Sequence, residues 1–281
     1  MTPTIIHLAH SPDSDDAFMF YALAEGKIDT GALRYVHELA DIESLNQRAL
    51  SGELEVSAVS IHAYAYLADR YALLASGSSM GDGYGPRLVA TVPAGPDPRA
   101  SLRGKRVAVP GLRTTAYLAL KLYQPDVEAV VMPFDRIGDA VTAGEADVGL
   151  LIHEGQLTYA DDGFHLWQDL GAWWLEDTGL PLPLGGNVVR RDLGPAVTAQ
   201  IARDLRASIE YGLAHRAPAL AHASRYNRGI SGERTDRFVG MYVNEWTVDY
   251  GPRGRAAVRL LLDRGFAAGI IPHPVQVEFV G

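Results

Sequence analysis

The chain has 281 residues, of which 47% are hydrophobic and 21% are charged, and its formal net charge is −9. This size and composition are typical of a globular protein with one large domain or two of ordinary size. The absence of cysteine excludes disulfides, thiolate nucleophiles, iron–sulfur clusters and cysteine-ligated zinc. The acidic balance argues against a nucleic-acid partner, because such proteins need a basic face to neutralise phosphates.

The segment before Asp13 has neither the basic region nor the apolar run of a signal peptide. No uninterrupted apolar stretch approaches the roughly 18 residues of a membrane span. We therefore expect a cytoplasmic protein without membrane insertion.

Short apolar runs alternate with amphipathic segments over the first third of the chain, which is the pattern of an α/β lobe. We expect strands at residues 4–9, 33–39, 55–59, 71–75 and 88–92. We expect helices at residues 15–26, at 60–69, and from an Asp41 cap to about Ala49. A cluster of prolines from Pro93 to Pro98 then indicates a crossing to a second lobe.

The same alternation restarts after this crossing. We expect strands at residues 106–110, 127–132 and 148–152, with a helix after the first and another capped by Asp135. The Pro- and Gly-rich run at residues 178–186 indicates the return crossing. A strand at 187–190 and a largely helical tail follow. The first lobe would then comprise residues 1–91 and 187–281, the second residues 92–186, with a hinged ligand cleft between them.

One segment occurs twice, once in each predicted lobe. Residues 49–59 (ALSGELEVSAV) and 140–151 (AVTAGEADVGLL) both end a helix, pass through Gly-Glu and enter an apolar strand. Gly52 and Gly144 suit the left-handed position that closes a helix. Since ligands of open α/β sheets bind beyond the carboxyl ends of strands, the residues that follow both copies should face the cleft.

His153 follows the second copy and is the best candidate for a catalytic residue, because histidine titrates near neutral pH and often acts as a general base. The alternative is a histidine that only makes a structural hydrogen bond. His10, His62 and His165 have weaker positions and are interpreted as structural. No histidine pair has the HxxxH or HxH spacing of a zinc site, so we expect no metal.

Two further strand ends carry candidate substrate-binding residues. The turn Gly111-Leu112-Arg113-Thr114-Thr115-Ala116 joins a strand to a helix, so its backbone N–H groups and threonine hydroxyls could bind an anion. The turn could also serve only as a helix cap, and the two interpretations are compatible. Ser60 ends the matching strand of the first lobe, where it is either a cap or a contact in the cleft. No GxSxG motif surrounds Ser60, which argues against a serine hydrolase.

Two other groups are open to more than one interpretation. Asp13, Asp15 and Asp16 could suggest a metal or phosphatase site, but acidic residues at a helix start mostly compensate the helix dipole while facing solvent or substrate. Trp173 and Trp174 could stack on an aromatic ligand, although packing in the core or at the hinge is favoured.

Several of these segments together resemble a known family. They are SPDSDDAFMFYAL (11–23), SAVSIHAYA (57–65), GLRTTAYLAL (111–120), LLIHEGQLTY (150–159) and LGAWWLEDTGLPLPLG (170–185). The chain resembles the 1,4-dihydroxy-6-naphthoate synthases of the futalosine route to menaquinone. The resemblance implies the two-lobed fold of type II periplasmic binding proteins, used by a cytoplasmic enzyme.

The resemblance also implies an activity and a set of site residues. The family converts cyclic dehypoxanthine futalosine to 1,4-dihydroxy-6-naphthoate and dihydroxyacetone without a cofactor, and its general base matches His153. Its substrate contacts match the strand end from Ala58 to Ser60 and the turn residues Thr114, Thr115 and Ala116; Asp16 is a further candidate. The chain departs from the family pattern at Ala58, where we expect lysine, and at residues 15–17, where we expect Asn-Asp-Thr.

Two other functions compete with this one. A solute receptor of a transporter would have the same fold but return its ligand unchanged. The chorismate dehydratase of the same pathway also shares the fold. The IHE motif that contains His153 and the run WWLEDTGLPLPLG favour the naphthoate synthase.

Overall fold

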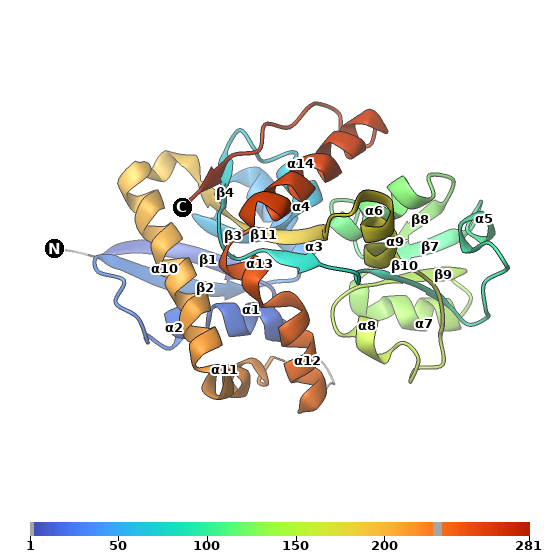
Figure 1. Cartoon of the computed structure of the whole chain (residues 1–281), viewed down its shortest axis with the longest axis horizontal. Helices are drawn as coiled ribbons and strands as arrows, with labels where there is room; N and C mark the ends of the chain where they lie inside the picture. Colours follow the sequence, from blue (N-terminus) through green and yellow to red (C-terminus); the bar gives the residue numbers. More distant parts are fainter. Residues whose placement is uncertain (1–2, 227–231) are drawn as a thin grey trace.

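The computed structural model describes residues 3–226 and 232–281, which form two β-sheets with flanking helices (Figure 1). The first sheet has the strand order β12-β4-β11-β3-β1-β2, with β5 paired to β11, and the second has the order β10-β6-β9-β7-β8. Both sheets mix parallel with antiparallel pairs. The predicted α/β fold, with two lobes that each contain a mixed sheet, is confirmed.

The strands of the first sheet are β1 (Thr4–His10), β2 (Leu33–Leu39), β3 (Val56–Ser60), β4 (Tyr71–Leu74), β5 (Ser79–Gly81), β11 (Leu182–Arg190) and β12 (Phe279–Val280). The strands of the second sheet are β6 (Arg87–Ala90), β7 (Arg106–Val109), β8 (Glu128–Val131), β9 (Val148–Leu151) and β10 (His165–Asp169).

The helices beside the first sheet are α1 (Ser14–Met19), α2 (Tyr21–Ala24), α3 (Ile42–Ser51), α4 (Ile61–Tyr64), α10 (Pro195–Ala214), α11 (Arg216–Ala223), α12 (Glu233–Tyr242), α13 (Glu245–Val248) and α14 (Gly251–Ala267). Those of the second lobe, on the right of Figure 1, are α5 (Pro98–Ser101), α6 (Thr115–Tyr123), α7 (Ile137–Thr142), α8 (Gly155–Thr158) and α9 (Leu170–Thr178). Short 3₁₀ helices occupy Phe134–Arg136 and Arg191–Leu193.

The repeated segment forms equivalent elements in the two lobes, α3–β3 in the first and α7–β9 in the second. Gly52 and Gly144 have φ angles of 76° and 74°, so the left-handed helix end predicted for both is confirmed. β3 and β9 are buried along their whole length, as expected of short apolar strands in the interior of a sheet. Both strands deliver the residues that follow them to one region between the sheets.

Both crossings between the lobes lie earlier in the chain than we predicted. β6 falls within residues 1–91, yet it pairs with β9 and β10 of the second sheet. β11 occupies much of the run 178–186 that was expected to form the return crossing, and it pairs with β5, β3 and β4 of the first sheet. Pro183 is tolerated because β11 there pairs with the short strand β5 beside a register irregularity. On strand pairing, the crossings lie between β5 and β6 and between α9 and β11.

Two predicted helices are shorter than their sequence pattern indicated. The helix expected at residues 15–26 is divided at Phe20 into α1 and α2. The helix expected at 60–69 is regular only in α4 and continues as turns. Every residue of α1, α2 and α4 is buried except Ala24 at the end of α2. Packing rather than helix propensity therefore determines the local backbone.

The largest apolar core cluster extends through both lobes. It includes Tyr64 and Val188 of the first lobe and Leu118, Leu150 and Trp174 of the second. α6 contacts α4, α14 and β11 across the lobe boundary. The lobes are therefore joined by buried apolar surface as well as by the two crossings. Within the described residues, no helix is both long and apolar enough to span a bilayer.

Candidate active site

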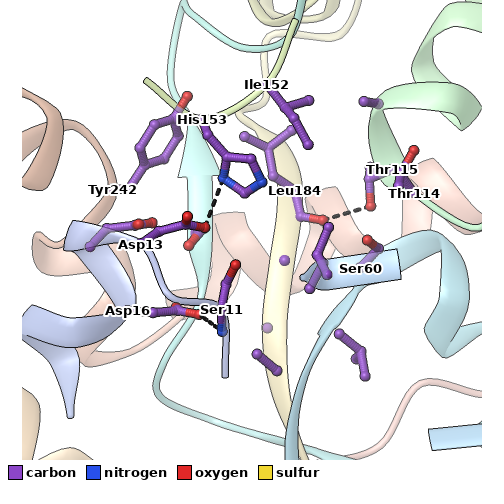
Figure 2. Close-up of a pocket in the computed structure, with 18 of the residues that line it drawn as sticks. Ser11, Asp13, Asp16, Ser60, Thr114, Thr115, Ile152, His153, Leu184 and Tyr242 are labelled. Atoms are coloured by element: carbon purple, nitrogen blue, oxygen red, sulfur yellow. Dashed lines mark hydrogen bonds and ion pairs between the residues drawn. The ribbon is translucent and has the colours of Figure 1, made fainter. Parts of the chain in front are cut away.

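A cavity lies between the two sheets, where strands from both lobes end. Its walls include Ser11 and Asp13 after β1, Ser60 at the end of β3, Thr114 after β7, and His153 after β9 (Figure 2). Counted out to its open mouth, the empty space is about 760 Å³. The cleft expected from two lobes is therefore present, and the strand ends form its walls.

His153 is held against a carboxylate of the opposite lobe. Its Nδ1 lies 2.9 Å from Oδ2 of Asp13, and the side chains are 16% and 2% exposed. Among the described residues, His153 is the one non-glycine residue with a positive φ, at 54°. Backbone strain of this kind is held in place by surrounding contacts and is common at functional sites. The ring also lies edge-on to Phe134, at 5.0 Å between centroids.

The contact with Asp13 determines which ring nitrogen of His153 faces the cavity. Nδ1 carries the hydrogen that is donated to Asp13, so Nε2 has the free lone pair when the ring is neutral. Nε2 is buried and has no hydrogen-bond partner within residues 3–226 and 232–281. Burial lowers the pKa of His153, but Asp13, Glu154 and Asp15 more than offset this effect, and the pKa is raised above its ordinary value of 6.5.

Gln156 of α8 connects His153 to Tyr242 of α12. With its amide oriented to satisfy both ends, Gln156 donates to the carbonyl of Gly85 at 2.7 Å and to the Tyr242 hydroxyl at 2.6 Å. Its carbonyl oxygen then accepts the backbone N–H of His153 at 3.3 Å. Figure 2 shows Tyr242 beside His153 at the same end of the cavity. The hydrogen bond from the His153 N–H to Gln156 helps to hold the strained backbone of His153.

Two further carboxyl groups lie at the start of α1. The Asp16 carboxylate accepts the Ser11 N–H at 2.8 Å. Burial, aided by the neighbouring Asp13, raises the pKa of Asp16 from 3.8 to about 7. Burial and then the charges of Asp16 and Asp13 raise the pKa of Asp15 well above its ordinary value. Asp15 therefore holds its proton at pH values at which an ordinary aspartate is already ionised.

The opposite wall of the cavity carries hydroxyl and N–H groups. Asn46 fixes Ser60, because its amide donates to the Ser60 Oγ at 3.2 Å and its carbonyl accepts the Ser60 N–H at 2.9 Å. The Ser60 hydroxyl proton is thus left to donate elsewhere. The Thr114 hydroxyl donates to the Gly111 carbonyl and caps α6 by accepting the Tyr117 N–H.

The Thr115 hydroxyl donates to the Leu184 carbonyl at 2.6 Å and accepts the His62 N–H at 3.1 Å. The expectation that the hydroxyls of Thr114 and Thr115 offer donors to an anion is therefore wrong, because each hydrogen already has an acceptor within the protein. The backbone N–H groups in the first turn of α6 still point out of the helix start.

Comparison with known proteins connects this geometry to a family. A family model described as menaquinone biosynthesis matches residues 6–267. Relatives named 1,4-dihydroxy-6-naphthoate synthase, from Thermus thermophilus and Streptomyces coelicolor, are each 40% identical; the matches cover 97% of this chain and 99% and 96% of the relatives.

The chain belongs to this family. The resemblance seen in the sequence is thereby confirmed.

Solved structures agree with the family membership. A protein of Archaeoglobus fulgidus is 49% identical with a TM-score of 0.90, and the match covers 95% of this chain and 98% of that one. The alkanesulfonate-binding protein of Xanthomonas axonopodis is 13% identical with a TM-score of 0.68, over 99% of this chain and 97% of that one. The second likeness shows the fold alone, which is that of periplasmic binding proteins.

In this member of the menaquinone-biosynthesis family, the residues selected from the sequence all line the cavity; they are Asp16, Ala58, Ser60, Thr114, Thr115, Ala116 and His153. Their roles remain predictions. The side chain of Trp174 is buried and donates to the Pro181 carbonyl at 3.1 Å, and the Trp173 ring packs on Tyr123 at 5.1 Å. Core packing is therefore the correct interpretation of both tryptophans.

Sequence reasoning missed the contact of Asp13 with His153, because it interpreted Asp13 as dipole compensation. Asp13 does stand at the N-cap of α1, but its side chain makes no cap hydrogen bond and contacts His153 instead. Tyr242 and Gln156 were also missed. Tyr242 lies far from His153 in the sequence, so no local signal identifies it. Gln156 lies within the quoted segment LLIHEGQLTY, but its contact with Tyr242 cannot be read from the sequence. Among the described residues, no group of three or more potential ligands is placed to hold a metal ion.

Proposed function

We propose that this chain is a 1,4-dihydroxy-6-naphthoate synthase. It converts cyclic dehypoxanthine futalosine to 1,4-dihydroxy-6-naphthoate and dihydroxyacetone, as a cytoplasmic, cofactor-free carbon–carbon lyase. Membership of the family and the names of the two relatives support the reaction. The single observation that supports the mechanism is the buried Nε2 of His153 on the cavity wall, which has no hydrogen-bond partner in the described part of the chain.

His153 acts as the general base in this proposal. Asp13 orients the imidazole through Nδ1, so Nε2 takes the proton from the substrate. The imidazolium that forms is stabilised by the Asp13 carboxylate, as in other histidine–aspartate pairs. Because the pKa of His153 is raised, the neutral base becomes dominant at a higher pH than for an ordinary histidine.

The substrate carboxylate requires a separate binding site. The walls of the cavity described here contain no lysine or arginine, and Ala58 occupies the position at which we expected the family lysine. We place the carboxylate at the start of α6, where the N–H groups of Thr115 and Ala116 and the helix dipole favour an anion. The Ser60 hydroxyl, held by Asn46, supplies a further donor.

This arrangement separates the two ends of the substrate. The carboxylate faces Ser60 and α6, while the part to be cleaved faces His153. Proton removal by His153 leads to cleavage of the carbon–carbon bond and release of the three-carbon fragment, and formation of the aromatic naphthalene ring provides driving force. A positioned base and fixed dipoles can supply the remaining catalysis without a cofactor.

The direct test is incubation of the purified protein with cyclic dehypoxanthine futalosine, with naphthoate followed by absorbance and dihydroxyacetone by a coupled assay. His153→Asn should lower kcat by about 10²–10⁴-fold while substrate binding persists. His165→Asn is the matched control, because His165 is exposed on β10 and away from the cavity. A His153→Asn variant that turns over at the wild-type rate would refute the assigned role.

The same preparation distinguishes the competing functions. A solute receptor would bind a small molecule and return it unchanged, whereas a chorismate dehydratase would consume chorismate. Either result, combined with no turnover of the cyclic futalosine derivative, would replace the proposed reaction.

A further inference from the structure

The wall of the cavity carries buried polar atoms that the protein itself does not satisfy. Within residues 3–226 and 232–281, the cavity-lining atoms without a hydrogen-bond partner include Ser11 Oγ, Asp15 Oδ1, His153 Nε2 and Asn187 Oδ1. Buried polar groups in native proteins are nearly always hydrogen-bonded, and leaving one unsatisfied is costly. Several such atoms in one cavity are expected where a polar ligand binds.

Asp15 is a member of this set that has no role in the proposed mechanism. It lies in the first turn of α1 and is only 9% exposed, yet its Oδ1 has no protein partner in the described chain. It is close enough to His153 for the charge of each to affect the ionisation of the other. A structural carboxyl in such a place would be expected to cap the helix or pair with a cation.

We propose that Asp15 is a substrate-contacting residue, whose carboxyl group hydrogen-bonds to an oxygen atom of the part of the substrate that reacts at His153. This inference rests on the proposed function and extends it. In the cyclic futalosine derivative, that part is the hydroxyl-bearing fragment released as dihydroxyacetone. Asp15 would thus select for a hydroxyl or carbonyl oxygen next to the reacting centre.

The surroundings of Asp15 raise its pKa and so favour the protonated carboxyl group, which can donate a hydrogen bond. The charged and titratable groups that affect it come from its own helix start, from the turn after β9 and from α12; they are Asp13, Asp16, His153, Glu154 and Tyr242. Burial is the main cause of its raised pKa, and the neighbouring aspartates add to it. A neutral carboxyl offers one donor and further acceptor sites, so it can donate to a carbonyl oxygen, which a carboxylate cannot do.

The test uses Asp15→Leu, which removes every hydrogen bond at similar size, and Asp15→Asn, which keeps a donor and an acceptor but cannot ionise. Asp162→Asn is the charge-matched control, because Asp162 is exposed and does not line the cavity. Turnover of the cyclic substrate is measured for each variant. Binding of dihydroxyacetone alone is measured by saturation-transfer NMR over a range of pH.

For Asp15→Leu, kcat/KM and the affinity for dihydroxyacetone should each fall by about 10–100-fold, the effect of losing a buried hydrogen bond. Asp15→Asn should stay within about 10-fold of the wild type. Wild-type affinity should decrease as the pH rises and Asp15 ionises, whereas the affinity of Asp15→Asn should not decrease over the same range. A structural role would not produce this difference in pH dependence.

The two readouts separate failure of this inference from failure of the proposed function. If Asp15→Leu turns over the cyclic substrate at the wild-type rate, the inference is wrong but the enzyme assignment stands. Dihydroxyacetone binding that depends on Asp15, without turnover of the cyclic substrate, would support the contact and refute the reaction. Wild-type protein that binds no dihydroxyacetone, or variants that all bind it equally, would overturn the inference as well.

Discussion

Asp13 and His153 form a hydrogen-bonded pair whose members belong to different lobes. Asp13 follows β1 of the first sheet, His153 follows β9 of the second, and their Oδ2 and Nδ1 atoms are 2.9 Å apart. Ser14 and Glu154 extend the contact with a 3.5 Å hydrogen bond. The arrangement that brings the two lobes together is therefore the arrangement that orients the His153 ring. Opening of the lobes would separate the pair and leave His153 without its carboxylate.

Asp13→Asn should reduce activity and change its pH dependence. Asparagine keeps the shape but removes the charge that raises the pKa of His153, so the acidic limb of kcat/KM should move to lower pH. Poorer orientation of the ring should lower the maximal rate on the order of 10²-fold. The measurement is a pH profile of kcat/KM for both proteins; an acidic limb that does not move would show that Asp13 does not tune His153.

Asp16→Asn should stabilise the protein at neutral pH and have much less effect in acid. Asp16 ionises near 3.8 when unfolded and near 7 when folded, so the folded protein binds the extra proton between these values. The stability contributed by that proton is complete below about pH 4 and is lost as the pH rises through about 7. The loss amounts to at most about 4 kcal/mol.

Urea unfolding of the wild type and of Asp16→Asn at several pH values checks this prediction. The difference in free energy of unfolding should grow in favour of Asp16→Asn up to about pH 7 and then level off. The hydrogen bond from the Ser11 N–H survives because the asparagine carbonyl can accept it. A difference that is independent of pH would mean that the burial of Asp16 does not shift its ionisation.

Thr115→Val should destabilise the junction between the lobes. The Thr115 hydroxyl satisfies the Leu184 carbonyl of β11 and the His62 N–H of α4, and valine satisfies neither. Each buried group left unpaired costs about 1–3 kcal/mol. Thr115→Ser, which keeps the hydroxyl, should recover most of the loss in thermal or urea unfolding. Equal stability of the valine and serine variants would contradict the assigned role.

Gly171→Ala should be strongly destabilising. A Cβ at Gly171 would overlap the Tyr84 carbonyl oxygen, in the crossing between β5 and β6. The overlapped atom belongs to the backbone, so the clash can be relieved only if the crossing itself moves. We expect this to lower the free energy of unfolding by about 3 kcal/mol or more. The control is Gly138→Ala in α7, where the nearest atom is 3.5 Å away and helix propensity favours alanine. Melting temperatures should separate the two variants clearly.

The sequence by itself predicted the two α/β lobes and the strand ends that face the cavity. Strand and helix periodicities are local, and the carboxyl ends of strands point to the ligand site of such sheets, so the sequence pattern alone was enough to select His153 and Ser60. The paired glycines Gly52 and Gly144 were equally local signals. The turn at Thr114 was likewise selected from its position between a strand and a helix, and the family resemblance added the expected substrate.

Only the tertiary structure decided which groups act together across the cleft. Asp13 looked like an ordinary acidic residue at a helix start, because nothing in the residues around it indicates a partner 140 positions away. The threonine hydroxyls looked free until the approach of β11 and α4 gave Thr115 two partners. The first half of β11, up to Gly186, was predicted to be a crossing because its proline and glycines are local breakers, yet sheet pairing holds it extended. Contacts between distant segments produce no periodic pattern in the sequence, and in this protein they determine how the candidate active site is assembled.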